Sequence, residues 1–251
     1  MSFSVKADSY DRFMGRYSIQ LAPQLADLAG IARGQRVLDV GCGPGALTGE
    51  LVRRVGAANV SAVDPSEPFV AAARERHPGV DVRRASAEDL PFPDRTFDAA
   101  LAQLVIHFMA DPVVGLTEMA RVTRPDGVVA ASVWDHEGQG PLTPFWRAAR
   151  ELDPAIEGES RLPGVREGHL AELMEAAGLR DVEASAAFAQ VEHATFEGWW
   201  EPFTLGVGPA GVYTLALSAE QREALRQRCL ASLPPAPFVS TVRAWTVRGV
   251  V

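Results

Sequence analysis

The sequence predicts an α/β protein with a mostly parallel sheet that is covered by helices on both faces. Two observations predict it. Short apolar, β-branched runs alternate with segments of helical periodicity through the first half of the chain. These runs are nearly continuous rather than alternating with polar residues, which is typical of strands buried on both faces. The 251 residues contain no linker-like stretch and no internal repeat, so we expect a single domain over residues 1–251.

The elements of the first half follow from their hydrophobic spacing. In the segment 46–55, Leu47, Leu51 and Val55 recur every four residues and share one helical face. Strands are expected at 36–40, 60–63, 80–84, 97–103 and 128–133, and helices at 19–28, 46–55, 67–77 and 113–122. Each connection between neighbouring parallel strands is expected to cross over with the right hand.

The second half is less regular. Helices are expected at 144–152, 167–177 and 219–230, and strands at 181–188 and 241–250. Gly178 is a good C-terminal cap for the second of these helices, and Ser218 with Gln221 three residues later predicts the start of the third. Residues 195–237 separate the last two strands and are rich in aromatic side chains.

Composition excludes several classes of protein. The chain carries 32 acidic against 24 basic residues, a formal net charge of −8, which disfavours non-specific binding to nucleic acid. No apolar run approaches the ~18 residues of a membrane span, and the first residues lack the apolar core of a signal peptide. Two cysteines, Cys42 and Cys229, make neither a disulfide framework nor a zinc site. We therefore expect a cytoplasmic protein without a metal, as a monomer or a homodimer.

The strongest local signal is a glycine loop, VLDVGCGPG at 37–45, which follows a predicted strand and opens a predicted helix. Gly41 permits a tight turn and Gly43 lets a ligand approach the backbone, at the edge where open α/β sheets bind ligands. The GxGxG spacing differs from the GxGxxG of dinucleotide-binding proteins. Asp64 ends the next strand, where its carboxylate can accept both hydroxyls of a ribose. Asp64 could instead cap the following helix, and Gly41 could serve only the turn, but the order of strand, loop, helix, strand and acid favours ligand binding.

These segments resemble class I S-adenosylmethionine-dependent methyltransferases, especially the small-molecule group that includes the enzymes of ubiquinone and menaquinone biosynthesis. The matching segments are VLDVGCGPG (37–45), VSAVDPS (60–66), ASAEDLPFPDRTFDAALAQLVIHF (85–108) and EMARVTRPDGVVAAS (118–132). The resemblance implies a Rossmann-like, seven-stranded sheet in the order 3-2-1-4-5-7-6 with the last strand antiparallel. It also implies an N-terminal helical lid (1–30), a core (31–190 and 238–251) and a helical cap over the acceptor site (195–237).

The resemblance further implies the cofactor S-adenosyl-L-methionine, with S-adenosyl-L-homocysteine as product, and the residues that contact it. Asp39 is expected near the amino group of the cofactor, although its carboxylate could instead brace the loop. Many relatives carry Asp where this chain has Ser86, and a hydroxyl accepts more weakly from the adenine amine. The implied contacts are Tyr10, Arg16, Tyr17, Asp39, Gly41, Cys42, Gly43, Asp64, Pro65, Ser66, Ser86, Ala87, Glu88 and Gln103.

The acceptor side is defined less sharply. His107 follows the fourth strand at a family position near the methyl donor, where it could be a general base or could pack locally and position the loop. Asp135, His136 and His193 are further candidates for a base, and each is also an ordinary loop residue. Substrate contacts are expected from His107, Trp134, Trp199, Trp200 and Phe203. The aromatic ones suit an apolar or aromatic small molecule. Alternatively, they pack the insertion onto the core or form a dimer contact.

The leading functional hypothesis is therefore an enzyme that methylates a small molecule. Alternatives are a protein or RNA methyltransferase, and a protein that binds S-adenosylmethionine for regulation without turnover. The negative charge argues against RNA, as does the absence of an Asn/Asp-Pro-Pro-aromatic element after the fourth strand. A nicotinamide-dependent dehydrogenase is the weakest alternative because of the glycine spacing.

Overall fold

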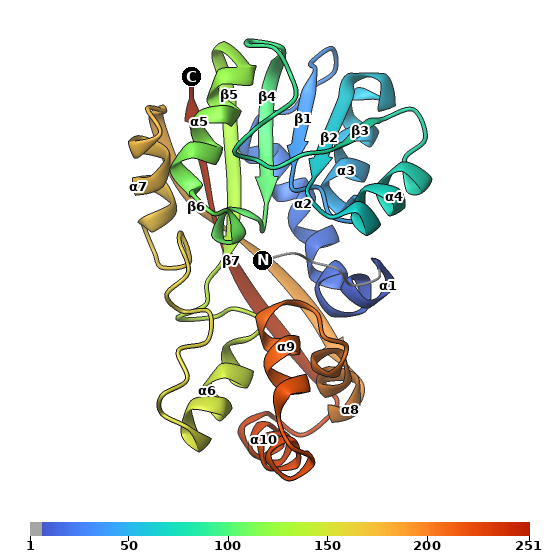
Figure 1. The fold of residues 1–251 in the computed structure, drawn as a ribbon, viewed down its shortest axis with the longest axis vertical. Coiled ribbons are helices and arrows are strands. Elements are labelled where there is room, and N and C mark those ends of the chain that lie inside the picture. Colours follow the sequence, from blue (N-terminus) through green and yellow to red (C-terminus); the bar gives the residue numbers. More distant parts are fainter. Residues whose placement is uncertain (1–6) are drawn as a thin grey trace.

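Seven strands form one sheet in the order β3-β2-β1-β4-β5-β7-β6, as predicted (Figure 1). The computed structural model describes residues 7–251, so the part of the predicted lid at residues 1–6 lies outside the described residues. The strands are β1 (Val37–Val40), β2 (Val60–Asp64), β3 (Asp81–Arg84), β4 (Phe97–Gln103), β5 (Thr123–Trp134), β6 (Arg180–His193) and β7 (Phe238–Val250). Strands β1 to β5 pair in parallel, and β7 runs antiparallel to both of its neighbours.

Helices cover both faces of the sheet. The helical elements of the described residues are α1 (Ala7–Tyr10), η1 (Asp11–Gly15), α2 (Arg16–Leu28), α3 (Ala46–Val55), η2 (Ala57–Asn59), α4 (Glu67–Arg76), η3 (Ile106–Phe108), α5 (Pro112–Val122), α6 (Thr143–Leu152), α7 (His169–Ala176), α8 (Phe196–Trp200), η4 (Glu201–Thr204), α9 (Gly208–Ala216) and α10 (Ala219–Ser232). Alternate residues of a strand point to opposite faces. On β4, Leu101 accordingly packs in the cluster that contains α2 and α3 residues, while Ala100 and Ala102 pack with α5 and α7.

Strands β6 and β7 are longer than expected. The predicted ranges 181–188 and 241–250 cover only part of them. They pair from Arg180 opposite Val250 to His193 opposite Phe238, and this ribbon extends beyond the parallel strands (Figure 1). The outer edge of β6 would otherwise present unpaired backbone groups. The side chains of Gln20 and Gln24 on α2 cover it, exchanging hydrogen bonds with the backbone of Gln190 and Phe188 at 2.8–3.1 Å.

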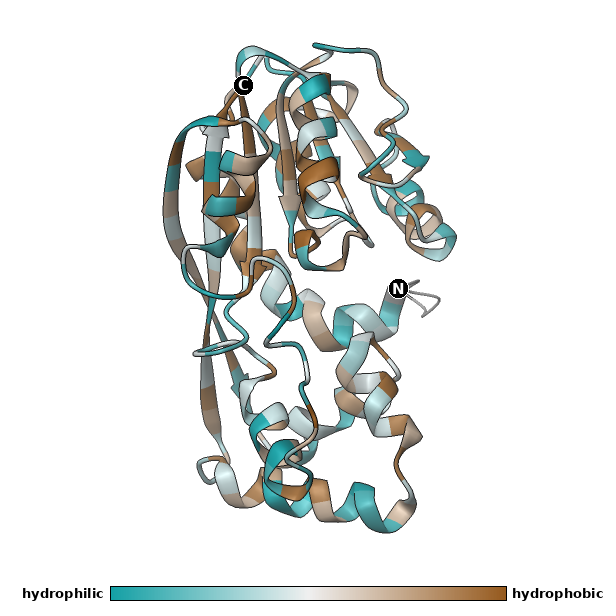
Figure 2. Cartoon of the chain, turned by 60° about the vertical axis from the view of Figure 1, so that its left-hand side comes forward, coloured by the Kyte–Doolittle hydropathy of each residue, from teal (hydrophilic) through white to brown (hydrophobic). Residues whose placement is uncertain are grey.

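A second group of helices surrounds the far end of the ribbon. Helices α6, α8, α9 and α10 lie there, beyond the carboxyl ends of the parallel strands (Figures 1 and 2). The predicted insertion 195–237 holds three of them, of which only α10 was expected as a helix. The N-terminal helices reach this group: the rings of Phe13 and Phe203 meet edge to face at 5.0 Å, and Arg12 pairs with Glu201. No helix of residues 7–251 is long and apolar enough to span a membrane.

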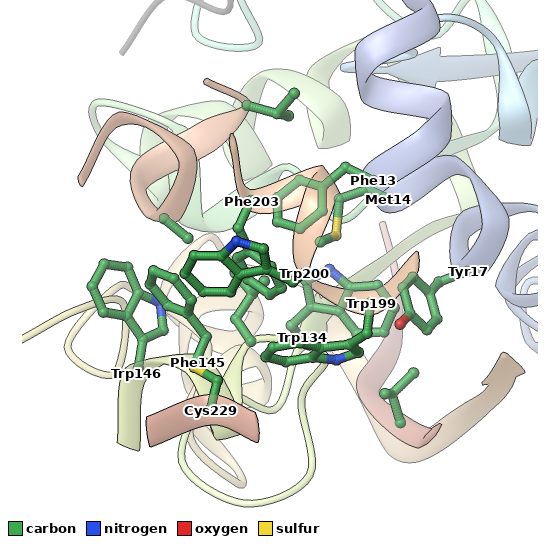
Figure 3. Close-up of a cluster of buried hydrophobic side chains, with 14 of the residues drawn as sticks. Phe13, Met14, Tyr17, Trp134, Phe145, Trp146, Trp199, Trp200, Phe203 and Cys229 are labelled. Carbon is green, nitrogen blue, oxygen red and sulfur yellow. The ribbon is translucent and has the colours of Figure 1, made fainter. Parts of the chain in front are cut away.

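The core of this second group is aromatic. Trp199, Trp200 and Phe203 are all buried there, and Phe145 of α6 stacks on Phe203 at 4.5 Å with nearly parallel rings (Figure 3). Phe13, Met14 and Tyr17 of the N-terminal segment belong to the same cluster. Because one continuous core joins the N-terminal helices to the insertion, these two segments pack as a unit against the carboxyl ends of the strands.

Candidate active site

The glycine loop after β1 is shaped by positive backbone angles. Gly41, Gly43 and Gly45 have φ values of +71°, +53° and +101°, a region that other residues enter at a cost. A Cβ on Gly41 would lie 2.4–2.8 Å from the side chain of Val105, so the bare backbone is needed for packing. A Cβ on Gly43 would meet no protein atom within 4 Å. Gly43 thus borders open space, where a ligand can approach the backbone.

Asp64 joins the end of β2 to this loop. Its Oδ2 accepts a hydrogen bond from the amide of Gly43 at 2.9 Å, and its Oδ1 accepts one from the amide of Ser66 at 2.8 Å. Burial raises the pKa of this carboxyl, and the two amide bonds only partly offset that effect. A carboxylate has about four acceptor sites, so Asp64 retains capacity for ligand hydroxyls on the cavity side.

Asp39 lies behind the loop and is fully buried. Thr48 of α3 donates to its Oδ2 at 2.6 Å, whereas its Oδ1 is buried without a hydrogen-bond partner. Burial raises the pKa of this carboxyl to about 7, although the Thr48 bond lowers it. An orphaned buried oxygen costs stability unless it is satisfied, which fits a residue that meets a polar or cationic group of a ligand.

A cavity of about 660 Å³ opens in front of the loop, within the size range of cofactor sites. Eleven of the predicted site residues line it: Tyr10, Gly41, Gly43, Asp64, Pro65, Ser66, Ser86, Ala87, Glu88, Gln103 and His107. Ser86 and Glu88 hydrogen-bond to each other, and Ala110 donates its amide to Glu88 at 2.8 Å. Gln103 donates to the Ser18 carbonyl at 3.0 Å while its amide oxygen lacks a partner.

The structure places the other predicted residues outside this lining. Asp39 lies behind the loop, and Cys42 is buried with its thiol 3.5 Å from the Gly43 carbonyl oxygen. Arg16 donates to the Gly198 carbonyl at 3.5 Å, and Tyr17 packs edge to face on Trp134 at 6.0 Å. Trp199, Trp200 and Phe203, expected at the substrate, likewise line neither this cavity nor the smaller one beside it.

The smaller cavity, here called the apolar chamber, adjoins the large one. Tyr10, Leu104, His107 and Phe108 line both. Apolar or aromatic side chains make most of the remaining wall: Phe13, Met14, Trp134, Leu142, Val207, Pro209 and Ala210, together with Gly208. The chamber holds about 40 Å³ of free space. It lies between the large cavity and the second group of helices, so a molecule inside it would sit against whatever fills the large cavity.

Two histidines bring polar atoms into the chamber wall. The rings of His107 and His136 lie 5.7 Å apart and both are buried. Both ring nitrogens of His136 and the Nδ1 of His107 lack a hydrogen-bond partner. Burial lowers the pKa of His136 to about 4, although Asp135 opposes the effect, and burial lowers the pKa of His107 well below its usual value. Both imidazoles are therefore neutral at neutral pH.

Glu159 is a third polar group of the chamber, and sequence reasoning missed it. Its Oε2 accepts a hydrogen bond from the indole of Trp146 at 2.8 Å. Burial raises the pKa of its carboxyl to about 7, although the Trp146 bond lowers it. Glu159 comes from a segment without helix or strand between α6 and α7. Because that segment has no periodicity, no sequence signal could have placed its side chain in a cavity wall.

The other two candidates for a base lie elsewhere. Arg243 donates to Asp135 at 2.7 Å, and the amides of Gly138 and Gln139 donate to the same carboxylate at 2.8 Å. Burial alone would raise the pKa of Asp135, but these bonds outweigh it and lower the pKa. His193 stacks on Phe238 at 4.9 Å and lines neither cavity.

Fold and site together resemble those of class I S-adenosylmethionine-dependent methyltransferase domains. Residues 38–131 match the model of a methyltransferase domain family. A putative methyltransferase from an antibiotic-biosynthesis pathway of Anabaena variabilis shares the fold with a TM-score of 0.62 at 18% identity, over 93% of this chain and 97% of that one.

Curated relatives match about half of this chain. A fatty-acid O-methyltransferase of Mycolicibacterium smegmatis is 40% identical over 116 residues, which are 45% of this chain and 42% of that protein. A demethylmenaquinone methyltransferase of Renibacterium salmoninarum is 33% identical over 137 residues, covering 54% of this chain and 57% of that protein. The chain thus spans about half the length of the curated relatives it matches.

The residues of the large cavity fit S-adenosylmethionine. The open space at Gly43 and the carboxylate of Asp64 suit the ribose side. The unpartnered amide oxygen of Gln103 suits the cationic amino group at the other end. The cavity of about 660 Å³ has room for a nucleoside with an amino-acid tail.

Proposed function

We propose that this protein transfers the methyl group of S-adenosylmethionine to a small molecule with an apolar or aromatic body. The observation that carries the proposal is that two cavities share four lining residues, one cavity being lined by the glycine loop and Asp64 and the other mostly by apolar side chains. In class I methyltransferases the cofactor supplies a methyl group on a sulfonium, and attack occurs in line with the breaking carbon–sulfur bond. Four residues shared by the two cavities mark where donor and acceptor would meet.

The residues of the chain contribute alignment and exclusion of water rather than covalent chemistry. We assign Asp64, Gly43 and the loop amides to holding the cofactor, and Gln103 to its methyl-bearing end. His107 would touch the acceptor, because it lines both cavities. Its lowered pKa makes it a hydrogen-bonding and positioning group at neutral pH rather than a strong base.

We further propose that residues 7–30 and 195–237 cover the site together. Their shared aromatic core and the Arg12–Glu201 pair support a joint movement. On this proposal Trp199, Trp200 and Phe203 shape the acceptor side indirectly, by holding Phe13 and Met14 in the chamber wall. Small-molecule acceptors among relatives, such as the fatty acid and the demethylmenaquinone of the proteins described above, agree with an acceptor of this kind.

Calorimetry tests the cofactor directly. S-adenosylmethionine and S-adenosylhomocysteine should both bind to the purified protein, whereas NAD should not. A screen of phenols, quinones, polyketides, amines and carboxylic acids, read by mass spectrometry for a gain of one methyl group, then tests turnover. Preferred binding of NAD would overturn the proposal, and tight cofactor binding without transfer to any acceptor would indicate a regulatory protein instead.

A further inference from the structure

The polar groups of the apolar chamber are few, and its two imidazoles are neutral and short of hydrogen-bond partners. Its titratable lining residues are Tyr10, His107, His136 and Glu159, and it contains no arginine or lysine. Three imidazole nitrogens there are buried without a hydrogen-bond partner. Leaving buried polar atoms unpaired is costly. Such a set is therefore expected to receive its partners from a bound molecule.

We propose that the acceptor presents a carboxylate to this chamber, between His107, His136 and Glu159, and that the product is a methyl ester. This inference rests on the methyl transfer proposed above. The carboxylate oxygen forms the new bond to the methyl carbon, and the carbon–sulfur bond breaks with its electron pair passing to sulfur. The products are the ester and S-adenosylhomocysteine. No proton is taken up or released by this step.

The hydrogen-bond chemistry of the chamber favours an oxygen anion. A neutral imidazole donates through one ring nitrogen, and a protonated carboxyl donates through its hydroxyl. His107, His136 and Glu159 can therefore each supply a donor below about pH 7. An ammonium group would face these donors with donors of its own. It would also have to lose a proton before it could attack.

A neutral hydroxyl fits less well for a different reason. A phenol has a pKa of roughly 10, whereas burial lowers the pKa of His136 to about 4. This imidazole is too weak a base to take such a proton effectively. A carboxylate is already ionised at neutral pH and needs no base.

The N-terminus of α9 adds a second favourable element. Gly208, Pro209 and Ala210 form its first turn and line the chamber. The N-terminal end of a helix carries partial positive charge, which stabilises a nearby anion. His136, which is 4% exposed and has two unpartnered ring nitrogens, lines the same chamber. The helix N-terminus and the hydrogen-bond donor of His136 therefore both favour a negatively charged group in the chamber.

The size and apolarity of the chamber also suit this reaction. About 40 Å³ of free space is room for two or three water-sized groups, at roughly 10–15 Å³ each, and hence for a carboxylate. Phe13, Met14 and Val207 of the chamber wall offer apolar contacts to the carbon atoms next to the carboxylate. Carboxylate and sulfonium both lose their charge as the ester forms, so surroundings that solvate charge poorly favour the transition state over the separated ions.

Head-group specificity tests the inference. We would measure binding of octanoate, 1-octanol and octylamine to the protein saturated with S-adenosylhomocysteine, and methylation of the same three probes with S-adenosylmethionine. Octanoate should bind at least tenfold more tightly than the others and should yield methyl octanoate. Absence of octanoate binding, or preferred methylation of the alcohol or the amine, would overturn the inference. The proposed function fails separately, if neither form of the cofactor binds.

Two buried histidines make a matched pair of variants. In the free protein both nitrogens of His136 and both of His193 lack partners, so replacing either ring by phenylalanine should keep or raise the melting temperature. Only His136→Phe should weaken octanoate binding, by at least tenfold. His136→Gln restores a hydrogen-bond donor. Its affinity for octanoate should lie within about threefold of that of the unmodified protein, a difference in binding free energy of about 0.7 kcal/mol. Equal binding by the His136→Phe and His193→Phe variants would contradict the inference.

Discussion

The carboxylate Oδ2 of Asp64 lies 2.9 Å from the amide nitrogen of Gly43, which ties the end of β2 to the glycine loop that follows β1. Backbone hydrogen bonds run alongside, because the amides of Gly41 and Cys42 donate to the Val63 carbonyl at 2.8 and 2.9 Å. One acidic side chain thus shapes the loop and faces the cavity at once. The proposed cofactor site depends on this contact between two neighbouring strands.

Replacing this carboxylate tests its double role. Asp64→Ala should weaken S-adenosylhomocysteine binding at least tenfold, about 1.4 kcal/mol, because charge-assisted hydrogen bonds are lost. Calorimetry measures the change. Asp81→Ala, at an exposed position of β3, should bind like the unmodified protein. Unchanged affinity in the Asp64 variant would refute its ribose role.

Gly43 can be tested against a glycine of similar conformation. Gly43→Ala should cost about 1–2 kcal/mol of folding stability from its positive φ, and its methyl group would enter the space assigned to the cofactor. The control is Gly30→Ala. Gly30 has a φ of +66° and equally open surroundings, but it lies after α2 and does not line the cavity. Both variants should lose similar stability in denaturant titrations, and only Gly43→Ala should lose cofactor affinity. Equal affinities would argue against a ligand at Gly43.

Glu159 should make stability depend on pH. Its folded pKa of about 7 exceeds the usual 4.5, so the folded state holds the proton more tightly. Glu159 therefore leaves the free energy of unfolding unchanged below about pH 4.5. As the pH rises through 7 it lowers that free energy, by an amount on the order of 3 kcal/mol. Glu159→Gln should raise the melting temperature at pH 8 and leave it unchanged at pH 4.5. An equal effect at both values would show that Glu159 is not a buried titrating group.

The same carboxyl should govern the pH dependence of carboxylate binding. Once Glu159 ionises above about pH 7 it repels an anion and no longer donates. Octanoate affinity should therefore fall between pH 7 and 9, while Tyr10, with its pKa raised by burial to about 12, stays neutral. Glu159→Gln keeps a neutral donor at all pH values and should flatten this profile in calorimetric titrations. A profile that the substitution leaves unchanged would exclude Glu159 from the binding site.

The ionised carboxylate of Asp135 should stabilise the folded protein, whereas that of Glu159 destabilises it. The pKa of Asp135 is lowered in the folded protein, so its stabilisation is present above about pH 4 and is lost as the pH falls below that value. Asp135→Asn should reduce the free energy of unfolding by about 2 kcal/mol at pH 7, because the charged partner of Arg243 is lost. Denaturant titrations should show the difference shrinking towards pH 3. The exposed Asp126→Asn should have no effect, and equal losses in both variants would contradict this role of Asp135.

Most elements of the sheet could be predicted because their signals are local. The segment from Val37 to Asp64 shows strand, loop, helix and strand in sequence, each with its own hydrophobic spacing. The ends of β6 and β7 could not be predicted, because the added residues are held by pairing with each other and by Gln20 and Gln24, which are distant in sequence. Helices α8 and α9 are short and owe their form to packing in the aromatic cluster.

The sequence by itself determined the proposed cofactor side of this protein. The alternation of strands and helices, the glycine loop and the acid after β2 are local patterns, and the strand order brings their ends together. Only the tertiary structure decided the acceptor side. It placed Trp199 and Trp200 in a core and joined His107, His136 and Glu159, from three separate segments, in one chamber. A cavity wall is made by long-range packing, and no periodicity along the chain records which side chains will meet there.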